Sequence, residues 1–388
     1  MMKLGKAIVY ANILEETAKE QIINIQKQPC MRDSKIRIMP DVHSGKDCVI
    51  GFTANIKDKI IPNLVGCDIG CGVLVVELGK RHINLKNLDN FIHNNIPNGN
   101  GNIRNTPICP FPRLNDLYIK LDNITKSYAL CSIGTLGSGN HFIEIDKDDD
   151  DNLYLLIHSG SRYLGQVINK YYNKLCVKER NYKERKELIE KYKAEGREQE
   201  IESALKNMVI DKDILPYLSD EACVAYLHDM EICQDFARIN RNEIGREILN
   251  FLDILPISAF HTVHNYISFK DGIMRKGAVS AHLGEKLIIP VNMRDGAFIC
   301  TGKGNPEWNY SAPHGAGRIM SRARAKEILY LKDFQDDMKD IYTTCINKET
   351  IDESPAAYKS LDNLLNNNIQ DTVNIEKRIR PIYNFKGV

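Results

Sequence analysis

The chain repeatedly places a short run of apolar, often β-branched residues directly before glycine, proline, aspartate or histidine. The clearest of these runs are Ile36–Met39, Val49–Thr53, Val73–Glu77, Leu153–Ile157, Leu287–Val291 and Phe298–Thr301. Runs of this length and composition predict β-strands, and the polar residues that bound them predict loops at the strand ends. We therefore expect a body of strands whose end loops carry function.

From about Gly165 to Leu252 the sequence changes to a helical pattern. Within it, Lys170–Arg197 holds ten Lys and Arg against five Glu, a net charge of +5. This pattern indicates either a solvated helix face with i,i+4 ion pairs or a basic wall for a phosphate backbone. The sequence predicts a single α+β domain over residues 1–388, with a helical, partly basic excursion at about 165–252.

Three further segments have a predicted environment. Asp220–Leu249 is predicted to be a helix, and its apolar residues at helical spacing are expected in the core: Val224, Leu227, Ile232 and Phe236. His93–Pro107, rich in Asn and Gly, and Asp146–Asn152, nearly all acidic, are predicted to be solvated surface loops.

The overall composition is that of a soluble globular protein. Of 388 residues 43% are hydrophobic, and 52 Lys and Arg against 51 Asp and Glu leave a net charge of +1. A polyanionic partner would therefore have to meet a local basic face. Eleven scattered cysteines favour reduced thiols, and the chain has no signal-like start and no apolar run of membrane-spanning length. We expect a cytoplasmic protein with no membrane association.

Six of the ten histidines lie in short polar or glycine-rich contexts beside predicted strands: His43, His141, His158, His261, His264 and His314. A single histidine of this kind is more often structural than functional. Six in the same context favour a metal site or a catalytic site.

The most distinctive metal-ligand pattern is Gly66-Cys67-Asp68-Ile69-Gly70-Cys71-Gly72. Asp68 and Cys71, three residues apart on a glycine-supported turn, can point at one ion, although a buried thiol in a tight turn would give the same pattern. With His141, His158 and His264 the donors suffice for two adjacent divalent ions. This mixed N/O/S set is compatible with manganese or zinc. Ser159, Ser161 and Arg162 would suit phosphate contacts.

The segment Ser311–Arg318 places His314 on a glycine-rich loop. This histidine could be a metal ligand, a general base or a nucleophile toward phosphorus. The chain has no GxxxxGK[ST] motif and no GxGxxG after a strand, so a nucleotide would have to be held in another way.

Taken together, these motifs resemble the RtcB family of RNA-splicing ligases. The resemblance spans nearly the whole chain in the family's order. The matching segments are Met39–His43, Cys67–Gly72, Gly134–Glu144, His158–Arg162, His264–Tyr266, Arg275–Ala278, His314–Arg318, Ala357–Lys359 and Lys386-Gly387.

The resemblance implies joining of an RNA 3′-phosphate or 2′,3′-cyclic phosphate to a 5′-hydroxyl, with GTP and manganese. Asp68, Cys71 and His141 would hold one Mn²⁺, and Cys71, His158 and His264 the second. His314 would be the nucleophile that takes GMP from GTP. The implied nucleotide-binding residues are Asn140, His141, Phe142, Ile143, Glu144, His264, Asn265, Pro290, Val291, Asn292, Met293, His314, Gly315, Ala316, Gly317, Tyr358 and Lys386. An archease-like activator is a candidate partner.

The chain departs from the family pattern at three places. Pro290 is followed by Val-Asn-Met-Arg-Asp-Gly instead of Gly-Ser-Met-Gly, Tyr163 replaces a glycine, and Val388 follows the terminal Lys-Gly. We expect a divergent branch devoted to the repair of particular damaged RNAs. Two other functions use the same residues: a two-metal phosphoesterase acting on RNA ends, and a non-catalytic RNA-binding protein.

Overall fold

Two mostly antiparallel β-sheets form the frame of the protein. The structure is a computed structural model that describes residues 1–208 and 214–387, so Val388 lies outside the described residues. The first sheet has six strands in the order β1 (Met2–Leu4), β2 (Ala7–Val9), β3 (Ile36–His43), β4 (Ile50–Asn55), β12 (Ile273–Lys276) and β11 (Asn265–Ile267). The second has seven, in the order β10 (Ser258–Val263), β6 (Gly72–Gly79), β8 (Leu153–Ser159), β7 (Phe142–Lys147), β17 (Val373–Lys386), β15 (Gly296–Gly302) and β14 (Lys286–Asn292).

All six predicted strands are confirmed, as β3, β4, β6, β8, β14 and β15. Two small sheets pair β13 (Ala278–Ser280) with β16 (Ser311–Pro313), and β5 (Lys59–Ile60) with β9 (Leu218–Ser219). Residues 1–208 and 214–387 also contain ten α-helices, and the whole is an α+β fold, as expected from the sequence.

The strand β17 was not predicted, although it lies inside the seven-stranded sheet between β7 and β15. Its sequence is rich in charged residues and contains Pro381, which cannot donate a ladder hydrogen bond. The register shifts between Pro381 and Tyr383, so the proline lies at a β-bulge and the strand continues past it.

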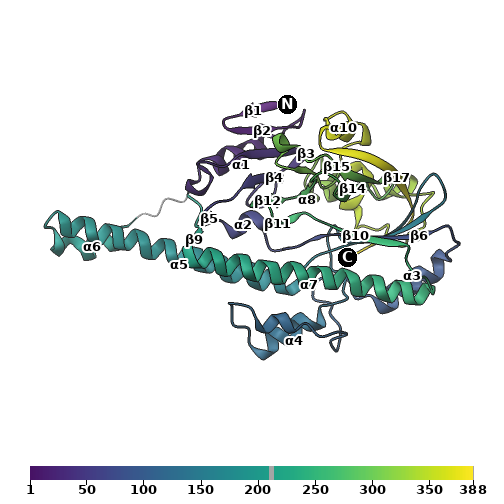
Figure 1. Ribbon diagram of the computed structural model, residues 1–388, viewed down its shortest axis with the longest axis horizontal. Coiled ribbons are helices and arrows are strands. Elements are labelled where there is room, and N and C mark those ends of the chain that lie inside the picture. The colour runs from purple at the N-terminus through teal and green to yellow at the C-terminus, as the bar shows by residue number, and fades with distance from the viewer. Residues whose placement is uncertain (209–213, 388) are drawn as a thin grey trace.

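Two helices of 33 residues, α5 (Arg162–Ala194) and α7 (Asp220–Leu252), run along the body (Figure 1). The first half of α7 packs Tyr226, Met230 and Phe236 into the core of the six-stranded sheet. Its second half packs Ile244 and Ile248 into the core of the seven-stranded sheet. One helix therefore fixes the position of the two sheets relative to each other.

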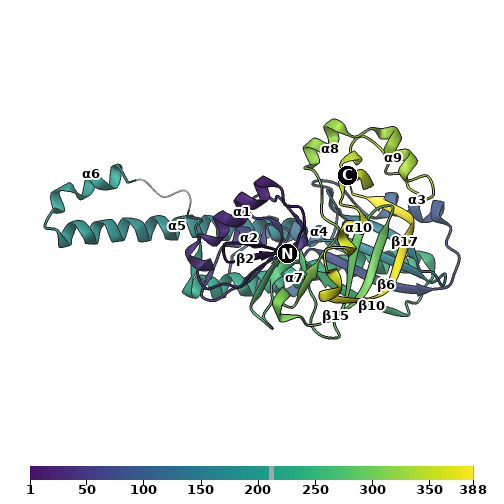
Figure 2. The same cartoon turned by 90° about the horizontal axis from the view of Figure 1, so that it is seen from above.

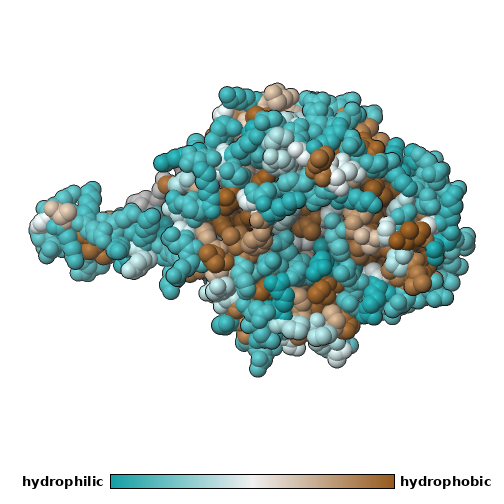
Figure 3. Space-filling view, in the orientation of Figure 1, coloured by the Kyte–Doolittle hydropathy of each residue, from teal (hydrophilic) through white to brown (hydrophobic). Residues whose placement is uncertain are grey.

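The outer part of α5 and the short α6 (Ile201–Lys206) project from the body as an arm (Figure 2). The visible surface of this arm is mostly hydrophilic (Figure 3). The remaining helices are α1 (Glu16–Gln26), α2 (Pro62–Val65), α3 (Leu85–Asn95), α4 (Asn123–Cys131), α8 (Arg322–Ile328), α9 (Leu331–Asp337) and α10 (Leu361–Leu365).

Three predicted environments need correction. Val224 was expected in the core but is 60% exposed on α7, whereas Ile232 and Phe236 are buried as expected. The spacing of apolar residues along a helix does not determine which edge of its apolar stripe contacts the core. The segment from His93 begins inside α3, which ends at Asn95.

The acidic segment at Asp146–Asn152 is not wholly a solvated loop. Asp146 belongs to β7 and is fully buried, because alternate residues of a strand point to the same face of the sheet. Asp148 is also buried and accepts hydrogen bonds from the side chains of Asn152, Tyr154 and Lys377.

All eleven cysteines are free thiols. Across residues 1–208 and 214–387, no helix combines the length and apolar character needed to span a bilayer.

Candidate active site

The five predicted metal ligands converge from separate parts of the chain. Asp68 and Cys71 lie on the turn before β6, His141 directly before β7, His158 in β8 and His264 between β10 and β11. They form two groups that share Cys71: Asp68, Cys71 and His141, and Cys71, His158 and His264, with the ligand atoms of each group within 4.8 Å of one another. All except Asp68 are buried.

Backbone carbonyls fix the orientation of two of the imidazoles. The Nδ1 of His141 lies 2.9 Å from the Leu136 carbonyl, and that of His158 lies 3.1 Å from the Asn140 carbonyl. A carbonyl only accepts, so Nδ1 carries the proton and, in a neutral ring, Nε2 presents its lone pair. The Nε2 atoms of His141 and His158 lie 3.4 Å and 3.3 Å from the Cys71 sulfur.

The electrostatics of the cluster suit a cation. Burial and the neighbouring imidazoles His264 and His141 hold the pKa of His158 well below its ordinary value. Burial, together with His314, does the same to the pKa of His264. Both rings are then neutral, and the Nε2 atoms of His158 and His264 lie 3.4 Å apart. Burial and the Asp68 carboxylate raise the pKa of the Cys71 thiol, and a bound cation would reverse that effect. The donor set therefore fits divalent ions.

The ligand loops are held by two buried polar side chains of α7. The amide oxygen of Asn240 accepts from the backbone N–H groups of Gly134 (2.8 Å) and Thr135 (3.1 Å). Arg241 donates to the carbonyls of Gly70 (2.9 Å) and Ser159 (2.7 Å). Both are fully buried. The middle of α7 therefore anchors the loops that carry the ligands.

Gly160 lets Asp68 approach the loop after β8. A Cβ built at position 160 would lie 1.9 Å from Asp68 Oδ1, which is a clash with the ligand itself. The glycine therefore provides space for a predicted metal ligand.

His314 lies beside the metal cluster and is held by Asp41. Its ring centroid is 5.0 Å from that of His264. Its Nδ1 is 2.6 Å from Asp41 Oδ2, and its backbone N–H donates to the same oxygen at 3.1 Å. Asp41, at the buried end of β3, has no exposed surface. With Nδ1 engaged in this way, the other ring nitrogen of His314 is available to a substrate.

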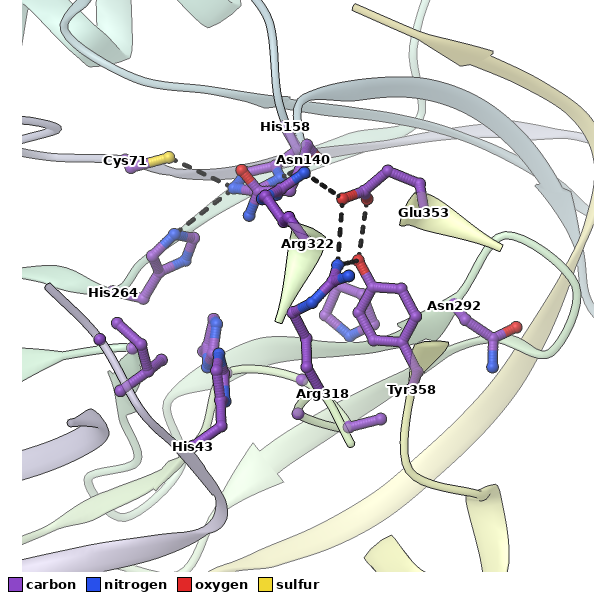
Figure 4. A pocket seen from close by; sticks show the side chains of 18 of the residues that line it. His43, Cys71, Asn140, His158, His264, Asn292, Arg318, Arg322, Glu353 and Tyr358 are labelled. Carbon is purple, nitrogen blue, oxygen red and sulfur yellow. Dashed lines mark hydrogen bonds and ion pairs between the residues drawn. The ribbon is translucent and has the colours of Figure 1, made fainter. Parts of the chain in front are cut away.

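These groups open into a cavity of about 890 Å³. Figure 4 shows Cys71, His158 and His264 on one side of it and a group of side chains that includes Glu353 and Tyr358 on another. Most residues of the expected nucleotide site line this cavity: Asn140, Phe142, Glu144, His264, Asn265, Pro290, Val291, Asn292, Met293, His314, Gly315, Ala316, Gly317, Tyr358 and Lys386.

The two other expected nucleotide residues lie outside the cavity wall. His141 belongs to the metal cluster, and the side chain of Ile143 is fully buried in the core of the seven-stranded sheet. Ser159 and Ser161 are also fully buried, so the structure contradicts the expectation that they contact phosphate directly. His261 is on β10, where it accepts from Arg241 and contacts Asn242.

Glu353, which the sequence analysis did not single out, is the centre of a charged network in the wall. It is 2% exposed and lies within 3.3 Å of Arg318, 2.6 Å of Arg322 and 3.1 Å of Lys386. The Tyr358 hydroxyl donates to it at 2.8 Å. Arg322 also pairs with Asp352 at 2.7 Å, so three cations meet two carboxylates, and these cationic groups suit a phosphate-bearing ligand.

Glu144 forms another polar part of the wall. Burial raises its pKa to about 7, against the opposing effects of the Lys386 charge and the hydrogen bond from Asn384.

The Val291–Gly296 segment carries two charges that the family pattern lacks, and these charges are paired in the fold. Arg294 lies 3.1 Å from Asp295 and 2.5 Å from Asp337. Asn292 also donates to Asp295 at 2.8 Å.

Comparison with known proteins identifies the relationship. A family model described as "tRNA-splicing ligase RtcB" matches residues 21–110 and 117–387. The chain belongs to the RtcB family. It is 31% identical to the RNA-splicing ligase RtcB of Escherichia coli K12 over 412 positions, which cover 96% of this chain and 95% of the relative. It is 27% identical to the tRNA-splicing ligase RtcB of Aeropyrum pernix over 480 positions, covering 98% and 95%.

The sequence analysis missed two groups of residues that lie around this site. Glu353 and Arg322 come from a 3-10 turn (Ile351–Glu353) and from α8, in contexts without a metal-ligand or nucleotide-binding pattern. Asn240 and Arg241 lie within a long amphipathic helix. A polar pair in the middle of an apolar helical stripe was the available signal for the second group.

Proposed function

We propose that this RtcB protein is a GTP- and Mn²⁺-dependent RNA ligase. It joins RNA 3′-phosphate or 2′,3′-cyclic phosphate ends to 5′-hydroxyl ends, in RNA repair or splicing. The family membership supports RNA ligation, and the whole-chain match supports one catalytic domain. The observation that carries the mechanism is the Asp41–His314 contact beside the two groups of metal ligands.

His314 is the proposed nucleophile. With Nδ1–H donated to Asp41, its Nε2 attacks the α-phosphorus of GTP, and the bond from that phosphorus to pyrophosphate breaks. The imidazole becomes cationic in this step, and the buried Asp41 carboxylate stabilises that charge. The product is His314 carrying GMP through an N–P bond.

The GMP is then transferred to the RNA end. An oxygen of the 3′-phosphate displaces His314 from phosphorus and forms a mixed anhydride. The 5′-hydroxyl attacks the RNA phosphorus, and GMP and a proton leave. This activation is needed because a 3′-phosphate has no good leaving group of its own.

Asp68, Cys71 and His141 would hold one Mn²⁺, and Cys71, His158 and His264 a second. The ions would supply Lewis-acid stabilisation of negative charge on phosphate oxygens. Arg318, Arg322 and Lys386 would bind phosphate groups on the opposite wall, while Glu144 and Tyr358 would contact the guanine base.

A labelled-nucleotide experiment tests this proposal. The protein is incubated with Mn²⁺ and GTP labelled at the α-phosphorus, and the protein-bound label is measured for the wild type and His314→Ala. We expect an acid-labile, alkali-stable adduct in the wild type that His314→Ala lacks. A wild-type protein that forms no adduct, and that releases phosphate once an RNA with a 3′-phosphate is added, would be a two-metal phosphoesterase, and that result would refute the ligase.

A further inference from the structure

Lys359 is a buried lysine that reaches the strand carrying Asp41. Its Nζ donates to the carbonyl of Pro40 at 3.0 Å and to that of Val42 at 2.8 Å, the residues on either side of Asp41. Its backbone N–H donates to the Gly317 carbonyl at 2.9 Å. Lys359 therefore ties the Asp41 strand to the loop that carries His314.

The two connected segments are in close contact. Gly317 has φ +79°, and a Cβ there would lie 2.2 Å from the Asp41 carbonyl oxygen. The same carbonyl accepts a hydrogen bond from Nδ1 of His43 at 2.8 Å. The carbonyls of residues 40, 41 and 42 thus each have a side-chain donor, which leaves the backbone around Asp41 little freedom to rotate.

The charge of Lys359 also matters to Asp41. The Asp41 carboxylate is fully buried, and its Oδ1 has no hydrogen-bond partner among the described residues. A buried carboxylate with incomplete hydrogen bonding is costly unless a cation lies nearby. Burial lowers the pKa of Lys359, and the negative charges of Asp41 and Glu15 oppose that effect.

We propose that Lys359 is a positioning residue that acts on His314 through Asp41. It holds the backbone on both sides of Asp41, places a positive charge near the carboxylate and keeps that carboxylate aimed at His314 Nδ1. This inference rests on the proposed nucleophilic role of His314. Lys359 does not line the cavity, so its effect is expected on the guanylation step and not on metal binding.

A double-mutant cycle separates this role from a general structural one. Lys359→Met keeps the length of the side chain but removes the charge and the donors. The rate of His314 guanylation is measured in single turnover for Lys359→Met, Asp41→Asn and the double variant. We expect Lys359→Met to slow guanylation by about 10- to 100-fold, the range for loss of a charged hydrogen-bonding group. The double variant should be no slower than Asp41→Asn alone.

A matched control comes from the same region. Lys35 precedes β3 and donates to the Pro306 carbonyl at 2.7 Å, but its side chain is 37% exposed and pairs with Glu307. Lys35→Met should guanylate at the wild-type rate. Mn²⁺ binding should be unchanged in Lys359→Met, because Lys359 touches no metal ligand.

Chemical rescue makes the test independent of how well one variant folds. Lys359→Ala leaves room for a small amine, so ethylammonium should restore guanylation at least several-fold over tetramethylammonium at the same ionic strength. A wild-type guanylation rate in Lys359→Met would overturn the inference. So would a double variant whose rate is reduced by the product of the two single-variant reductions, because the two residues would then act independently. A wild-type protein that forms no adduct would instead refute the proposed function on which the inference rests.

Discussion

Asp41 holds His314 by two hydrogen bonds to a single oxygen: the ring Nδ1 at 2.6 Å and the backbone N–H at 3.1 Å from Oδ2. One contact orients the ring and the other fixes the loop. The arrangement selects the tautomer with Nδ1–H and leaves the second ring nitrogen free to act as the proposed nucleophile.

Asp41→Asn should therefore impair guanylation while preserving the fold. An asparagine that turns its NH₂ toward Nδ1 would reverse the tautomer, and in either orientation the charge is lost. We expect the single-turnover rate of adduct formation to fall by on the order of 10²- to 10⁴-fold, as in other histidine–aspartate pairs. Unchanged thermal unfolding would show that the loss is chemical, and a rate within twofold of the wild type would contradict the role of Asp41.

The shared thiolate predicts how metal binding responds to mutation. His141→Ala and His264→Ala each remove a donor from one group of ligands, so each should weaken the binding of one Mn²⁺ ion. Cys71→Ala removes a donor from both groups and should weaken both. Titration followed by Mn²⁺ electron paramagnetic resonance measures this directly. If Cys71→Ala lost no more metal than His141→Ala, the bridging arrangement would be wrong.

His43 predicts a pH dependence of stability in the metal-free protein. Burial lowers its pKa from 6.5 to about 4 in the fold. Between these values the unfolded chain binds a proton that the folded protein excludes. The free energy of unfolding should therefore fall as the pH drops from about 6.5 to about 4, by about 2–3 kcal/mol from this group. Urea unfolding of His43→Gln at pH 7.5 and pH 5 should show a smaller loss than the wild type, and an equal loss would exclude His43 as a source.

The basic part of α5 is our candidate surface for the body of the RNA. Lys170, Lys174 and Lys178 follow one another at i,i+4 spacing and are exposed, and exposed Tyr182 continues their stripe. Changing all three lysines to Glu should weaken RNA binding. The slope of log K against the logarithm of the salt concentration should become smaller in magnitude by about 2–3.

A matched triple variant on the same helix controls for net charge. Lys183, Lys186 and Lys191 are also exposed but lie among the glutamates of α5, and Lys186 pairs with Glu190 at 3.8 Å. Their reversal changes the total charge equally and should affect RNA binding much less. Equal effects of the two triple variants would mean that α5 acts only through the overall charge.

The sequence predicted which side chains come together in the cluster, because they lie next to recognisable strands and glycines in family order, and their role as metal ligands stays a prediction. All five side chains converge as expected: Asp68, Cys71, His141, His158 and His264. Spacing alone did not exclude the alternative that Cys71 is a structural thiol in a tight turn. The strands with β-branched runs were also predictable. The strand β17 was not predictable, because its sequence contains charges and a proline. It is a strand inside the sheet because β7 and β15 pair with it on either side.

The supports of the site were much harder to predict. Lys359 and Asp41 are 318 positions apart in the sequence, and Lys359 reaches the carbonyls of Pro40 and Val42 only in the folded chain. Glu353 has an unremarkable local sequence, and three cations reach it from other segments. Single-sequence patterns report local periodicity and turns, so they do not reveal which distant polar groups pair in the interior.

RNA joining with Mn²⁺ and GTP is the measurement that tests the central claim most directly. An RNA with a labelled 3′-phosphate and a second RNA with a 5′-hydroxyl are incubated with the wild type or His314→Ala. We predict that the label becomes phosphatase-resistant, within a new phosphodiester, with the wild type alone. Release of the label as free phosphate without joining, or joining by His314→Ala at the wild-type rate, would contradict a ligase that works through guanylated His314.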